Sequence, residues 1–67
     1  MPLKREPNIV DFDGLYADLI GAHSNLSEAD SAALNARLVL LLANQVGDPQ
    51  VLLACIAEAC EQGRRRP

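Results

Sequence analysis

The sequence is poor in the residue types that build catalytic and cofactor sites. Its 67 residues include one histidine, two cysteines, one tyrosine, one phenylalanine and no tryptophan. A lone histidine has no second imidazole to share a metal ion with, and no Ser-His-Asp order can be recognised around it. The four glycines form no phosphate-binding loop. We therefore expect no catalytic residue, no cofactor site and no metal site, and a protein that is not an enzyme.

Positive charge is missing from the middle of the chain. Between Glu6 and Gly63, nine acidic residues are opposed by a single base, Arg37. Such a body repels phosphate groups, whereas a nucleic-acid-binding domain carries a basic face. We therefore expect no nucleic-acid partner. We interpret Arg64–Arg66 as part of a solvated tail, with docking to an acidic partner surface as the alternative.

Long apolar runs are absent as well. The longest, Val51–Ala57, covers seven residues, far short of the roughly 20 that a membrane span needs. Lys4 and Arg5 are followed by Glu6-Pro7-Asn8, not by the apolar stretch of a signal peptide. Cys55 and Cys60 are interpreted as two small buried side chains in a reducing compartment. These observations predict a cytoplasmic protein without membrane contact.

The main positive feature is the apolar stretch Ala32–Val46. On a helical wheel, leucines fill one side of this stretch, and alanines, valines and Leu40 fill most of the other. Only Asp30, Arg37 and Asn44 line up as a polar stripe. A helix that is apolar nearly all round belongs in a buried position. Because two short neighbouring helices cannot cover it, the stretch predicts a partner molecule.

Capping residues divide the chain into three helices. Asp11 is placed to cap a helix from Phe12 to about His23, and Ser27 to cap a second helix that ends at Gly47. Asp48 followed by Pro49 is typical of a third helix start, and Gly63 is expected to end that helix.

Two of these helices carry an apolar stripe. In the first helix the stripe consists of Phe12, Leu15, Tyr16, Leu19 and Ile20. In the third helix the expected buried face consists of Val51, Leu52, Cys55, Ile56, Ala59 and Cys60, whereas Gln50, Ala54, Glu58 and Glu61 are expected to point outward.

The fold class that follows is all-α. Short connections predict antiparallel neighbours, and hence a compact three-helix antiparallel unit with a long apolar central helix, assembled into a homodimer. Residues 1–10 are expected to form an extended arm, residues 11–63 the three-helix domain and residues 64–67 a basic tail.

The function expected is association with other protein surfaces. The predicted interface consists of Leu34, Arg37, Leu38, Leu40, Leu41 and Leu42. Arg37 has no acidic residue three or four positions away, so a close carboxylate partner would come from another helix or another chain; the alternative is a solvated arginine lying over leucines.

The second function considered is a carrier for a small apolar or aromatic ligand, with Tyr16 and His23 as polar handles. For His23, a structural or capping role is the other interpretation.

The sequence also resembles a family of short bacterial proteins of unknown function, each built as one helical domain. The resemblance rests on Pro7-Asn8, on the segment DFDGLY at 11–16, on SAALNARL at 31–38 and on LLANQVGD at 41–48. It implies a small accessory subunit, because proteins of this kind are often encoded beside flavin-dependent aromatic hydroxylases. The resemblance carries no active-site residues.

Overall fold

The computed structural model describes residues 3–65, which contain three helices. They are α1 (Phe12–His23), α2 (Glu28–Val46) and α3 (Pro49–Arg64). No residue between 3 and 65 lies in a strand, so the prediction of an all-α protein with three helices is confirmed. Residues 3–10 form an irregular arm. Residues 1–2 of the expected arm and residues 66–67 of the expected tail lie outside the part described.

Each helix begins at the capping residue that the sequence indicates. A side-chain oxygen of the cap accepts a hydrogen bond from a backbone N–H in the first turn, which stabilises a helix by about 0.5–2 kcal/mol relative to alanine. The three capping distances are 3.0 Å from Gly14 N to Asp11 Oδ1, 3.1 Å from Asp30 N to Ser27 Oγ and 2.9 Å from Gln50 N to Asp48 Oδ1.

The two connections use residues that tolerate a left-handed backbone. Asn25 has φ 63° in the link between α1 and α2, and Gly47 has φ 80° between α2 and α3. Asparagine and glycine are the residues that adopt positive φ most readily. The N–H of Gly47 donates to the carbonyl oxygen of Ala43 at 2.9 Å, so α2 ends at the glycine predicted to end it.

The predicted end of α3 at Gly63 is wrong. The helix continues through Gly63 to Arg64, and the N–H of Arg65 donates to the carbonyl oxygens of Glu61 and Gln62. Arg64 and Arg65 lie 3.6 Å and 3.9 Å from the carboxylate of Glu61. Basic side chains near a helix C-terminus favour continued helix because they oppose its negative end.

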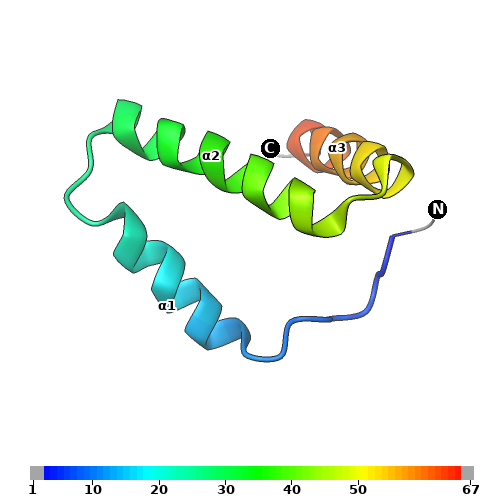
Figure 1. Ribbon diagram of the computed structural model, residues 1–67, viewed down its shortest axis with the longest axis horizontal. Coiled ribbons are helices and arrows are strands. Elements are labelled where there is room, and N and C mark those ends of the chain that lie inside the picture. The colour runs from blue at the N-terminus through cyan, green and yellow to red at the C-terminus, as the bar shows by residue number, and fades with distance from the viewer. Residues whose placement is uncertain (1–2, 66–67) are drawn as a thin grey trace.

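The helices are arranged more openly than the compact unit that their short connections predict. Figure 1 shows α1 and α2 meeting at one end and diverging toward the other, with α3 turned out of the plane in which α2 runs. The arm returns toward α3, where Arg5 and Glu58 form an ion pair at 3.2 Å. The radius of gyration is 13.7 Å, compared with about 11 Å for a compact domain of this length.

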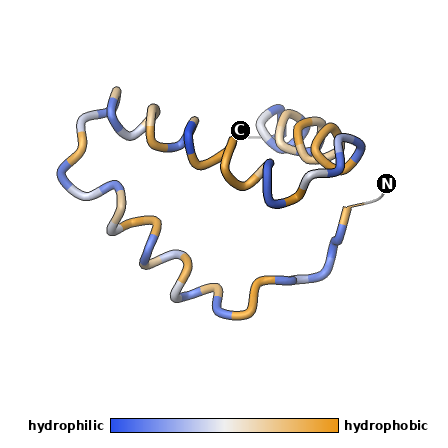
Figure 2. Tube along the Cα trace, in the orientation of Figure 1, coloured by the Kyte–Doolittle hydropathy of each residue, from blue (hydrophilic) through white to orange (hydrophobic). Residues whose placement is uncertain are grey.

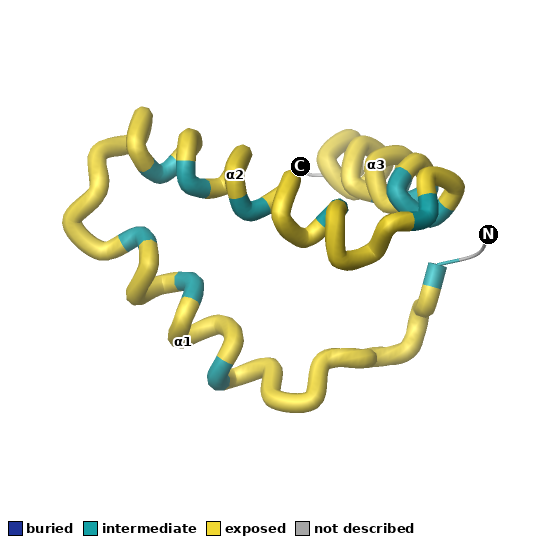
Figure 3. Tube along the Cα trace, viewed as in Figure 1, coloured by how far each residue is buried: buried dark blue, intermediate teal, exposed yellow. Residues whose placement is uncertain are grey.

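No described residue is buried. Figure 3 shows exposed residues along all three helices, interrupted by a few positions of intermediate exposure. On α2 these intermediate positions are Ser31, Leu34, Leu38 and Ala43. The single chain therefore has helices without a core, because α1 diverges from α2 and α3 crosses it.

The face of α3 that is partly covered differs from the predicted one. Val51 and Leu52 are partly covered as expected, but so are Ala54 and Glu58, which were expected to point outward. Four residues of the predicted buried face are exposed instead: Cys55, Ile56, Ala59 and Cys60. Helical periodicity identified an apolar face but not the position of the arm, which lies against the Glu58 side through Arg5.

Candidate interaction surface

The central helix presents its apolar side chains to solvent. Leu40 is 71% exposed and Leu41 65% exposed, and Val39 and Leu42 are also more than half exposed. Of the predicted interface, only Leu34 and Leu38 are partly covered, and Arg37 is exposed. Figure 2 shows hydrophobic colouring through the middle of α2, a hydrophilic interruption near the end of that helix, and hydrophobic colouring along much of α3.

An apolar groove lies where α2 and α3 meet. It has a volume of about 400 Å³ and is lined by Val39, Leu40, Leu42, Ala43, Val46, Leu52, Cys55 and Ile56. The short turn at Gly47 and Asp48 brings the two helices together at this point. No charged side chain lines the groove, so the walls offer apolar contact without polar groups to orient a ligand.

The predicted interface contains residues from only one wall of this groove. Leu40 and Leu42 belong to the predicted interface, but Leu52 and Ile56 were expected to be covered within the chain. The other wall could have been predicted from the short turn between α2 and α3, because such a turn places the apolar ends of the two helices side by side. No local sequence pattern predicts the direction in which α3 crosses α2.

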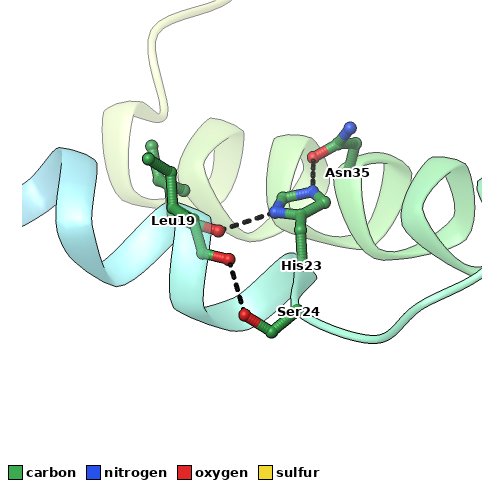
Figure 4. Close-up of a pocket in the computed structure, with 5 residues that line it drawn as sticks. Leu19, His23, Ser24 and Asn35 are labelled. Atoms are coloured by element: carbon green, nitrogen blue, oxygen red, sulfur yellow. Dashed lines mark hydrogen bonds between the residues drawn. The ribbon is translucent and has the colours of Figure 1, made fainter.

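The junction between α1 and α2 is held by a polar contact. Figure 4 shows the His23 ring between the two helices: Nδ1 lies 2.7 Å from the carbonyl oxygen of Leu19, and Nε2 lies 2.8 Å from Oδ1 of Asn35. The hydroxyl of Ser24 donates to the carbonyl oxygen of Ile20 at 3.4 Å. These contacts fit the structural role considered for His23.

Both ring nitrogens of His23 face oxygen acceptors. An imidazolium can donate to both, whereas the neutral ring has a single N–H. The hydrogen bond to the Leu19 carbonyl, followed by that to Asn35, raises the pKa of His23, and partial burial opposes this shift. The His23 position at the C-terminal end of α1 favours the same charged form.

The two predicted ligand handles are not brought into one site. The depression beside His23 is lined by Leu19, Ile20, His23, Ser24 and Asn35. Tyr16 does not line it and is 59% exposed. The His23 ring already uses both nitrogens within the chain. Their role as handles stays a prediction.

Within residues 3–65, charged side chains form ion pairs at the edge of α3 but not on α2. Hydrogen bonds from Gln62 and Arg5, together with the positive charge of Arg5, lower the pKa of Glu58. Arg37 forms no ion pair with any residue between 3 and 65. This matches the absence of acidic neighbours along its own helix.

The cysteines are exposed, contrary to the expectation that both are buried. Cys55 and Cys60 are free, exposed thiols on α3, and Cys55 lines the groove between α2 and α3. Within residues 3–65, no group of three or more histidine, cysteine, aspartate or glutamate side chains is placed to hold a metal ion. The same residues contain no helix with both the length and the apolar character that crossing a bilayer requires.

These features define a small all-helical protein whose distinctive surface is apolar and uncovered. Residues 3–61 match the model of the family described as "Protein of unknown function (DUF2783)". The chain belongs to this family. No curated protein and no solved structure matched the chain. The family description supplies no reaction, and no connection with flavin-dependent hydroxylases comes with it.

Proposed function

We propose that the protein is a non-catalytic interaction module that assembles through α2, first of all into a homodimer. The observation that carries this proposal is the complete absence of buried side chains between residues 3 and 65 in a chain that is 49% hydrophobic. Hydrophobic burial is the dominant favourable term in folding. When the leucines of a chain are exposed to solvent, the chain gains the free energy of hydrophobic burial only after another surface covers them.

The exposed area gives the size of the surface that needs a cover. The chain exposes 5,969 Å², whereas a compact monomer of 7.2 kDa exposes about 4,100 Å². The excess is roughly 1,900 Å² per chain, and two chains that buried it against each other would form an interface within the 2,000–5,000 Å² range of obligate homodimers. Two-fold pairing is also the commonest closed symmetry of protein oligomers.

The interface that we assign is centred on Leu40, Leu41 and Leu42. Their exposure leaves them free for a partner, and Leu34 and Leu38 continue the same helix toward α1. Arg37 lies at the edge of this surface without an ion-pair partner among the described residues, and a carboxylate of a second chain would supply one.

Sedimentation velocity of the wild type and of Leu41→Asp tests the proposal. We expect the wild type to sediment with the mass of two chains, and Leu41→Asp to lose association because a buried unpaired carboxylate is strongly unfavourable. Asn44→Asp is the matched control, since it adds the same charge to the polar stripe of α2 and should leave the dimer intact. A folded wild-type monomer at high concentration, or a dimer of Leu41→Asp, would contradict the proposal.

The same surface also suits an accessory subunit that docks on a larger enzyme. The resemblance noted above motivates this variant of the proposal, and it is compatible with self-association. Co-purification from the native host would reveal a partner of fixed stoichiometry. Recovery of the homodimer alone, without any enzyme, would argue for self-association as the whole function.

The α2–α3 groove is the observation that favours the second candidate, a carrier for a small apolar ligand. Its volume of about 400 Å³ falls within the range of ligand pockets, about 300–1,000 Å³, but such pockets also contain polar groups that fix orientation. Native mass spectrometry of the purified protein tests this candidate directly. A bound small molecule would support it, and an empty protein that aromatic compounds fail to stabilise would exclude it.

A further inference from the structure

We propose that the α2–α3 groove is the seat for the apolar face of α1 from a second copy, so that two chains exchange their α1 helices reciprocally. This inference rests on the proposed homodimer and states which surfaces meet in it. The face of α1 consists of Phe12, Leu15, Tyr16, Leu19 and Ile20, and the groove consists of the eight residues named above.

Both halves of this contact are largely exposed in each chain, and only Leu19 of the stripe and Ala43 and Leu52 of the groove are partly covered. Phe12 is 61% exposed and Ile20 53% exposed on α1, and Ile56 is 60% exposed at the groove. The twelve residues of α1 make a rod of about 18 Å, enough to cross a groove that extends over two turns of α2. Neither surface carries a charged side chain, so their contact desolvates no ion.

The chain does not cover its own groove because of the way α1 is attached. The His23 contact with Asn35 holds the C-terminal end of α1 against the first half of α2. From that point α1 diverges, and its Phe12 end lies far from α2 (Figure 1). The stripe lies on the same side of α1 as His23, so it faces the space between the diverging helices, where most of it stays exposed and open to a neighbouring molecule.

A second copy of the chain can cover both of the exposed apolar surfaces. Each chain contributes one stripe and one groove, so a two-fold axis satisfies both contacts in a closed pair and leaves neither exposed. The excess exposed area of each chain is of the size that an obligate dimer buries. Pairing of α2 alone would leave the stripe of α1 wet.

Disulfide trapping between two different chains tests the exchange. The first chain carries Tyr16→Cys together with Cys55→Ser and Cys60→Ser, and the second carries only Cys60→Ser, which retains the groove thiol Cys55. The chains are unfolded together, refolded and oxidised. Intact mass spectrometry then measures the disulfide-linked pair of unlike chains. We expect it to form several-fold faster than in the control.

The control moves the new thiol to the opposite side of α1. Ala17→Cys replaces Tyr16→Cys in the same background, and Ile20→Cys is the second test position within the stripe. Circular dichroism confirms that each chain is helical before oxidation. Equal trapping of Cys at 17 and at 16 would overturn the exchange, and so would failure at both 16 and 20.

A single chain with Tyr16→Cys and Cys60→Ser distinguishes exchange from closure of α1 on its own groove. We expect its disulfide to link two chains, and a product with the mass of one chain would overturn the proposal. Sedimentation velocity of the wild type shows whether the homodimer forms at all, and so distinguishes failure of the exchange from failure of the proposed function. A wild-type dimer in which neither position 16 nor position 20 is trapped by Cys55 would overturn the exchange alone, whereas a wild-type monomer would overturn both the exchange and the proposed homodimer.

Discussion

The two junctions of the chain join helices in opposite ways. The α1–α2 junction is a four-residue link held by the polar contact of His23 with Asn35, and the helices then diverge. The α2–α3 junction is a two-residue turn at Gly47 and Asp48 that brings apolar side chains together in a groove. One junction therefore positions a helix by directional hydrogen bonds, and the other by backbone geometry and apolar contact. The first junction contains a histidine whose two hydrogen bonds depend on its protonation state.

The largest effect on a junction is expected from Gly47→Ala. No atom obstructs a side chain at this position, so the whole effect comes from the backbone, where φ is 80°. We expect a loss of about 1–2 kcal/mol in the free energy of unfolding. Chemical denaturation at a fixed protein concentration measures it, because folding coupled to association depends on concentration.

Gly21→Ala is the matched control for this substitution. Gly21 lies inside α1 with open space around it and no positive φ, so alanine should raise stability by up to about 1 kcal/mol. If both substitutions shifted stability in the same direction, backbone strain at the α2–α3 turn would not be the reason.

Removal of a helix cap should have a smaller effect, and a similar one at the two junctions. Ser27→Ala and Asp48→Ala each remove one side-chain acceptor from a first-turn N–H. Each is expected to cost about 1 kcal/mol in denaturation experiments. A much larger loss for Asp48→Ala would show that its turn also controls the α2–α3 groove.

The pH dependence should distinguish the α1–α2 junction from the other one. Because the pKa of His23 is raised in the folded chain, its contribution to stability is fully present below the unfolded value of about 6.5. That contribution is lost as the pH rises through the raised pKa. We expect denaturation midpoints of the wild type to fall over this window, and those of His23→Gln to change less. NMR titration of the His23 ring checks the direction of the shift, and a pKa below the usual value would contradict it.

The smallest effect is expected from the ion pair between the arm and α3. Both Arg5 and Glu58 are accessible to water, and exposed ion pairs contribute little to stability. Glu58→Gln should leave the denaturation midpoint almost unchanged at moderate salt. A clear loss of stability that high salt abolishes would show that the arm is an integral part of the fold.

Local signals in the sequence predicted most of the helix boundaries. Asp11, Ser27, Asp48 and Gly47 each act within four residues of their own position, so the chain near them is enough to determine the outcome. The helix end predicted at Gly63 was wrong because the two arginines that follow it, paired with Glu61, favour continuation of the helix.

The arrangement of the helices could be predicted much less well. The distribution of apolar residues around α2 predicts that its own chain cannot bury it, and its leucines are exposed in the structure. The contact between His23 and Asn35, twelve residues apart, and the ion pair of Arg5 with Glu58 both depend on how distant segments meet. No local pattern predicts either contact. The predicted interface likewise includes Leu40 and Leu42 of the groove but none of its residues from α3.

The position of Cys55 gives the molecule a built-in reporter. Its thiol is exposed in the isolated chain and lines the groove, whereas Cys60 is exposed but lies outside the groove lining. If a partner chain covers the groove, the alkylation rate of Cys55 should fall as the protein concentration rises, whereas the alkylation rate of Cys60 should stay constant. The ratio of the two labelling rates would then read the fraction of assembled protein, in dilute solution or inside a cell, without any added tag.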